Sequence, residues 1–183
     1  MKTKFSVVAL LLVVICAPVF PADSATPAPT GPRVEVIYVN PEKFMDVKES
    51  YMGSERERDS ILSLLKDYLV ERAEKMIPEG HKLAITITDI DMAGDFEPQH
   101  GPQFNDVRIV KAIYPPRVDL SFKLTDASGA VVKEGQQKLR DLNFQMTSTA
   151  PAFNSDMLRY EKAMLDNWLR SEFPKAKASK EKK

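Results

Sequence analysis

The stretch from Arg117 to Thr125 constrains the fold more than any other part of the sequence, because apolar and polar residues alternate along its whole length. A strand with this period of two has one buried face and one face toward water. Asp126-Ala127-Ser128-Gly129 then forms a turn signal, so Ala130 to Phe144 can return as an antiparallel partner. A sheet with one apolar face needs a second layer to cover that face.

Two amphipathic helices are predicted to supply that layer, at Ser54–Ile77 and Phe153–Phe173. Each segment carries apolar residues at helical spacing along one face. Ser54 and Glu57 have the spacing of a capping box, which marks the start of the first helix. Candidate caps of the second helix are Asn154 and Ser155.

Three further strands are expected at Arg33–Val39, Leu83–Met92 and Val107–Tyr114, and Gly135 suggests a bulge or bend in the returning strand. The predicted class is therefore α+β. Its architecture is two-layered, with a mainly antiparallel sheet and two amphipathic helices on one face, in the order β-α-β-β-β-β-α. Leu83, Ile85 and Ile87 share one face of the second strand. If the alternation continues without interruption, Asp89 and Asp91 lie on that same buried face, unless a bulge shifts the register.

The N-terminus predicts export. Two lysines within Met-Lys-Thr-Lys precede a run from Phe5 to Phe20 that is apolar except for Ser6 and Pro18, and small residues follow it. These are the parts of a secretory leader, and the run is shorter than the ~20 residues of a spanning helix. An uncleaved membrane anchor is the alternative. The leader is expected to end at Ser24 or Ala25.

The predicted organisation is a signal peptide over 1–24, a Pro/Ala-rich spacer over 25–32, one domain over 33–173 and a basic flexible tail over 174–183. We expect a periplasmic protein, with full secretion as the alternative and no stable membrane span once the leader is removed.

Cys16 lies in the leader and is the single cysteine, so the mature chain would be cysteine-free, without disulfide or thiolate chemistry. The lysine tail could touch anionic lipid or nucleic acid, but a solvated terminus is favoured and no nucleic-acid partner is predicted.

The densest polar cluster lies at Asp89, Asp91, Asp95 and Glu97. Hard cations bind several carboxylate oxygens, and the first residues match part of a calcium-binding loop. The match fails where Ala93 and His100 stand at ligand positions five and twelve. The competing interpretation is a strand end and turn whose Asp side chains bond to local backbone. We predict no cofactor and no metal, and neither His81 nor His100 has the spacing of a zinc site.

Three arginines are expected to pair with aspartates across neighbouring strands: Arg108, Arg117 and Arg140 with Asp106, Asp119 and Asp141. The sequence contains no Gly-x-Ser-x-Gly elbow, phosphate loop or Gly-x-Gly-x-x-Gly turn. No catalytic residue is therefore predicted. The candidate binding residues are Asp89, Asp91, Asp95, Glu97, Arg108 and Asp141.

Four segments together resemble a family of exported bacterial proteins known as domain of unknown function 3016. The resemblance covers nearly all of the predicted mature chain and implies a Gram-negative envelope or secreted protein, but it implies no activity, ligand or catalytic residue. The segments are Val36–Phe44, Ile87–Pro98, Asp106–Ile109 continuing through Tyr114-Pro115-Pro116-Arg117 to Leu120, and Leu139–Phe144.

The sequence therefore favours a non-enzymatic binding or docking module with an envelope protein as its partner. Its sheet face, a sheet edge or the loop from Gly94 to Asn105 would form the contact. The alternative is a metal-assisted or carboxylate-based hydrolase centred on the Asp89–Glu97 cluster. The oligomeric state is left open.

Overall fold

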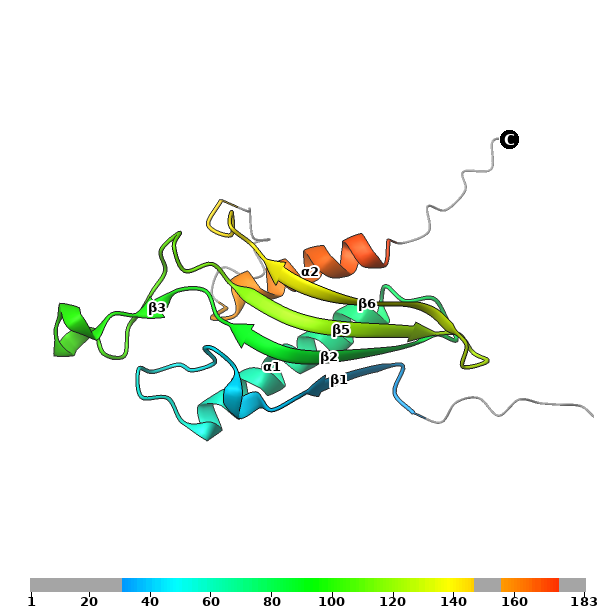
Figure 1. Ribbon diagram of the computed structural model, residues 1–183, viewed down its shortest axis with the longest axis horizontal. Helices are drawn as coiled ribbons and strands as arrows, with labels where there is room; N and C mark the ends of the chain where they lie inside the picture. The colour runs from blue at the N-terminus through cyan, green and yellow to red at the C-terminus, as the bar shows by residue number, and fades with distance from the viewer. Residues whose placement is uncertain (1–30, 147–155, 175–183) are drawn as a thin grey trace, which may run out of the picture.

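The computed structural model describes residues 31–146 and 156–174. The predicted leader and most of the basic tail lie outside these residues. A four-stranded sheet in the order β1-β2-β5-β6 forms one layer, and two helices form the other on a single face of the sheet (Figure 1). The predicted two-layer α+β class is confirmed. The strands of this sheet are β1 (Val34–Tyr38), β2 (Lys82–Asp91), β5 (Arg117–Thr125) and β6 (Val131–Arg140).

The helix α1 (Glu55–Glu74) connects β1 to β2, and these two strands run parallel. Parallel neighbours need such a crossover, which places the helix on one face of the sheet. Ser54 caps the helix as predicted, since its side chain accepts a hydrogen bond from the Glu57 backbone N–H at 3.2 Å. The remaining strand pairs, β2–β5 and β5–β6, are antiparallel.

The second helix, α2 (Arg159–Glu172), follows β6 and packs beside α1. Residues 153–155 of the predicted helix, with its two candidate caps, lie outside the described residues. The chain enters α2 through Asp156, whose Oδ1 accepts a hydrogen bond from the Leu158 N–H at 2.8 Å. This contact fixes the turn that leads into the helix, while the N-cap position, Leu158, has no side-chain cap hydrogen bond.

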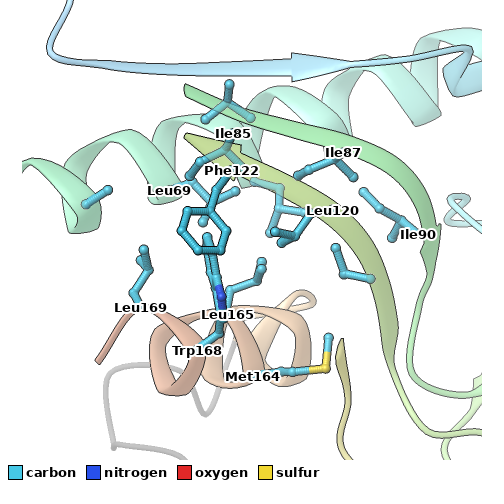
Figure 2. Close-up of a cluster of buried hydrophobic side chains, with 14 of the residues drawn as sticks. Leu69, Ile85, Ile87, Ile90, Leu120, Phe122, Met164, Leu165, Trp168 and Leu169 are labelled. Atoms are coloured by element: carbon cyan, nitrogen blue, oxygen red, sulfur yellow. The ribbon is translucent and has the colours of Figure 1, made fainter. Parts of the chain in front are cut away.

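The core lies between the sheet and the two helices. The alternating apolar residues of β5 are all buried in it, as the sequence predicted. Figure 2 shows two of them, Leu120 and Phe122, among side chains from β2, α1 and α2. The Phe122 ring meets the Trp168 ring edge-on, with 5.7 Å between centroids. Gly135, opposite Phe122 on β6, marks no bulge; a Cβ there would come within 3.0 Å of the Phe122 ring, so the close approach of that ring explains the glycine.

The third predicted strand, Val107–Tyr114, is wrong in extent. Only β4 (Arg108–Ile109) forms, and it pairs with β3 (Asp95–Phe96) in a separate two-stranded ribbon. Residues after it turn back, where the Tyr114 N–H donates to the Lys111 carbonyl at 2.9 Å. Three short 3-10 helices complete the elements: η1 (Pro41–Lys43), η2 (Pro98–His100) and η3 (Pro102–Phe104).

The segment 94–114 forms an arm that extends past the end of the main sheet (Figure 1). Its base is closed by a hydrogen bond of 3.0 Å from the Gly94 N–H to the Tyr114 carbonyl. Gly94 has a φ of +83°, and a Cβ there would lie 2.9 Å from the Ile109 carbonyl oxygen. Only glycine fits both conditions, so this residue allows the chain to leave the sheet and enter the arm.

Candidate functional site

A bulge in β2 decides which face carries the predicted acidic cluster. Ile87 pairs with Leu120 and Asp89 pairs with Asp119, which leaves Thr88 as an extra residue. Beyond the bulge the parity reverses, so Ile90 is buried and the two aspartates of β2 turn to the helix-free face. The sequence allowed for a bulge that would shift the register of this strand, and the structure contains that bulge.

Asp91 meets Arg117, its register partner on β5, in an ion pair on the helix-free face of the sheet. Burial raises the pKa of Asp91 above its usual value, while the Arg117 guanidinium acts in the opposite direction. The charges of Asp46 and Asp89 also raise it. The Asp91 carboxyl is thus a perturbed group at the end of the sheet, which is a feature of binding and catalytic sites as well as of structural pairs.

Arg108 joins the arm to the body of the domain. Its Nη1 donates to Asp46 Oδ2 at 2.7 Å and to the Gly94 carbonyl at 3.0 Å, and its Nη2 donates to the Lys48 carbonyl at 2.8 Å. The guanidinium also lies over the Phe96 ring, 4.6 Å from the centroid. The side chains of Arg108 and Asp46 are only 16% and 11% exposed, so this is a partly buried anchor.

Glu97 forms the centre of a second cluster within the arm. Its carboxylate accepts hydrogen bonds from Lys111 Nζ at 2.6 Å and from the Tyr114 hydroxyl at 3.1 Å, and it lies 2.8 Å from His100 Nε2. The hydrogen bond from Lys111 holds the pKa of Glu97 below its usual value. These contacts join both ends of the arm, so Glu97 stabilises the shape of the arm.

A cleft of about 330 Å³ lies between the base of the arm and the end of the sheet. Asp91 and Asp95 line it, and Asp95 Oδ1 accepts a hydrogen bond of 2.7 Å from the neighbouring Phe96 N–H. The cleft combines charged and apolar side chains, as expected for a binding surface with a few fixed polar groups. Its lining residues are Met45, Asp46, Lys48, Asp91, Gly94, Asp95, Ile113, Tyr114, Pro115 and Arg117.

Of the six candidate binding residues, only Asp91 and Asp95 line this cleft. Asp89 Oδ1 accepts a hydrogen bond of 2.8 Å from the Met45 N–H, and Asp141 Oδ1 accepts one of 2.9 Å from the Asn143 N–H. The Asp141 contact is the local kind expected of an Asp at a strand end, whereas the contact of Asp89 is to the backbone of a segment 44 residues away in the sequence. The structure brings Asp91, Asp95 and Arg108 to the base of the arm and places Glu97 farther along it.

Two of the three expected arginine pairs differ from those found. Arg108 pairs with Asp46 and Arg117 with Asp91, whereas Asp119 lies 3.4 Å from Lys138. Cross-strand pairing was inferred from neighbouring strands in sequence, but the bulge and the separate ribbon change which side chains lie opposite each other.

Glu161 on α2 was missed by the sequence reasoning. It is 1% exposed; its Oε1 accepts a hydrogen bond of 2.7 Å from the Ala93 N–H, while Oε2 is buried with no hydrogen-bond partner. Burial raises the pKa of Glu161. One signal was available, because Glu161 stands between Leu158 and Leu165 on the apolar face of the helix. Asp46 was missed as well, and it lies in a loop with no periodic signal.

Within residues 31–146 and 156–174, no three side chains among His, Cys, Asp and Glu gather where they could hold a metal ion. The same part of the chain contains no helix with the length and apolar character needed to cross a membrane.

Comparison with known proteins gives the family. Searches of curated proteins and of solved structures returned no significant match. The model of the family described as "Protein of unknown function (DUF3016)" matches residues 32–171, which includes the sheet, α1, most of α2 and the whole arm. The chain therefore belongs to the DUF3016 family of proteins of unknown function.

Proposed function

We propose that this chain is a docking module of the bacterial cell envelope, which binds another protein through its arm and the cleft at the base of the arm. The observation that carries the proposal is the combination of a firmly anchored arm with exposed apolar side chains beside the cleft. Met45 and Ile113 line this cleft and are 67% and 70% exposed.

The arm is held in place before any partner binds. Arg108 ties it to the Asp46 and Lys48 segment, Glu97 ties its two ends together, and the Gly94–Tyr114 hydrogen bond closes its base. A surface that is already ordered loses less conformational entropy on association. The contacts of Arg108, Glu97 and Gly94 therefore support a role of the arm in binding, and not only as a loop that connects two strands.

The exposed side chains indicate the chemistry of the partner. Val107 and Phe104 on the arm are also exposed, at 46% and 37%. Exposed apolar groups next to a cleft are typical of protein contact sites, where an apolar anchor of the partner enters the cleft and polar groups surround it. We infer a protein partner that inserts one apolar side chain between Met45 and Ile113.

The predicted leader supports the location of this module outside the cytoplasm, in the periplasm or, alternatively, in the secreted fraction. Mass spectrometry of the N-terminus of the protein recovered from the periplasm tests this part. We expect the mature chain to begin near residue 25. A chain that retains Met1 and stays in the cytoplasm would contradict export.

A photo-reactive amino acid at Ile113 tests the docking surface in living cells, with the same substitution at Leu64 as the control. Leu64 is 46% exposed on α1, away from the arm. A protein captured from position 113 would then be purified and titrated against the full exported chain. We expect Ile113→Asp to weaken binding at least about tenfold, with Leu64→Asp unchanged. Equal capture from both positions, or equal affinity of the two variants, would exclude the arm as the docking site.

One observation favours a carboxylate-based enzyme as the second candidate: Asp91, with its raised pKa, lines the cleft beside Asp95. A carboxyl group with a shifted pKa in a cleft is a candidate acid or base. A panel of ester and glycoside substrates, tested with the native chain and with Asp91→Asn, distinguishes the two functions. Turnover that Asp91→Asn removes would support the enzyme and count against the docking module.

A further inference from the structure

The far edge of the sheet is formed by β6, which has no strand on its outer side among the residues that the structure describes. The strand order places β6 at one end, and among the described residues only β5 pairs with it. β6 extends over ten residues, against five for the opposite edge strand β1. A strand of this length with unpaired backbone groups is a template for another strand, unless something covers it.

The hydrogen bonds of the sheet identify which residues of β6 present those free groups. The Asp141 N–H donates to the Pro116 carbonyl at 3.4 Å, so in the register of this pair the odd-numbered residues of β6 bond to β5. The pattern between β1 and β2 agrees, since the Leu83 N–H donates to Arg33 and the Ile87 carbonyl accepts from Val39. The backbone groups that point outward belong to Glu134, Gln136, Lys138 and Arg140.

These four residues make the edge complementary to itself. In an antiparallel pair of two β6 strands centred on Gln136, Glu134 of one copy lies opposite Lys138 of the other, and the symmetry produces this pair twice. Gln136 then faces Gln136 of the second copy as a hydrogen-bonded pair. A register centred on Lys138 would instead oppose two lysines, whereas one centred on Gln137 would pair Glu134 with Arg140. The charges thus favour a second copy of this chain, in a register centred on Gln136 or on Gln137.

We propose that two copies of this protein associate through β6 to form one continuous eight-stranded sheet with a twofold axis at Gln136. This inference concerns a different surface from the arm and does not depend on the docking function. The side chains involved lie on the helix-free face, where Glu134 and Lys138 now contact Lys123 and Asp119 of their own chain at 3.7 Å and 3.4 Å. The side chains of Glu134 and Lys138 are 61% and 88% exposed, so they can also reach across the new edge.

Single cysteines test the register directly. Cys16 is the one cysteine of the sequence, so a Cys16→Ser background carries only the introduced thiol. Hydrogen-bonded antiparallel partners have Cα atoms about 5.5 Å apart, which is within the range of a disulfide. We expect Gln136→Cys to form a disulfide-linked dimer with itself under mild oxidation. Glu134→Cys and Lys138→Cys should cross-link when mixed but not alone. Ser121→Cys, one strand inward on the same face, is the matched control.

Charge reversal supplies the second test, by sedimentation of the native exported chain over a range of concentrations. Glu134→Lys and Lys138→Glu should each weaken the dimer about tenfold or more, because each creates like-charged opposites twice. The double variant restores both intermolecular pairs of opposite charge. Within each chain, however, residues 134 and 138 then face Lys123 and Asp119 with like charges. Recovery of the dimer in the double variant supports the interface. A monomer at every concentration, cross-linking of Ser121→Cys as fast as Gln136→Cys, or no recovery in the double variant would overturn it.

Discussion

Asp91 on β2 and Arg117 on β5 are register partners and form an ion pair on the helix-free face of the sheet. They share that face because Thr88 is inserted as a bulge just before them. If Thr88 instead took a regular place in the ladder, the alternation set by Leu83, Ile85 and Ile87 would direct Asp91 into the core. A single bulged residue therefore determines that a carboxyl group lines the cleft.

Deletion of Thr88 is expected to leave the two faces of β2 unchanged, because it removes the one residue that has no partner on β5. Ile90 would stay buried and Asp91 would stay on the helix-free face, so the free energy of unfolding in urea should fall by less than about 2 kcal/mol. Ile90→Asp is the contrasting variant, because it puts an uncompensated carboxylate into the buried layer and should cost about 3–5 kcal/mol. A loss on deletion of Thr88 as large as that of Ile90→Asp would show that the strand needs the extra residue to keep its faces.

Arg108→Ala is expected to loosen the arm and to lower the free energy of unfolding by about 3 kcal/mol, because it leaves the Asp46 carboxylate partly buried without its partner. Arg108→Lys should recover only part of this, since an ammonium group cannot reach the same three acceptors in one plane. Hydrogen exchange of residues 94–114 reports the loosening. If exchange in the arm is the same in Arg108→Ala and the native chain, Arg108 is not its anchor.

Glu161 predicts a pH dependence of stability. Because burial raises its pKa in the folded state, the folded chain binds more protons than the unfolded chain between the usual pKa of glutamate and the raised one. The free energy of unfolding contributed by this group therefore falls as the pH rises through that window. Arg108 opposes the shift and Asp156 adds to it.

The variant Glu161→Gln should remove this contribution, so that its stability relative to the native chain increases as the pH is raised from about 4 toward neutrality. Urea unfolding at several pH values measures the difference. Glu74→Gln, on an exposed position of α1, is the control and should follow the native curve. A constant difference between Glu161→Gln and the native chain would show that Glu161 does not titrate across this range.

Gly135→Val is expected to destabilise the domain by about 1–3 kcal/mol, because its new side chain meets the buried Phe122 ring. Phe122→Leu removes the ring and should offset part of that cost when the two changes are combined. Thermal unfolding of the single and double variants gives the interaction energy. Strict additivity would mean that the two side chains do not compete for the same space.

The sequence alone predicted much of the fold. The alternation of β5, the turn after it and the amphipathic face of α1 each depend on residues close together in the chain, and the structure has all three. Ser54 was identified as a helix cap for the same reason, since a cap acts only on the first turn. Local periodicity was sufficient here, because each element must present one apolar face to the same core.

The candidate site was decided by tertiary structure. Asp91 and Arg117 are far apart in sequence and meet only through the register of β2 and β5, whereas Arg108 reaches Asp46 across the base of the arm. No local pattern indicates which distant carboxylate an arginine meets, or that the chain leaves the sheet at Gly94. The sequence determined the elements and the residues available for binding. The bulge and the close approach at Gly94 determined their neighbours, because long-range packing alone selects the register and the path of the chain.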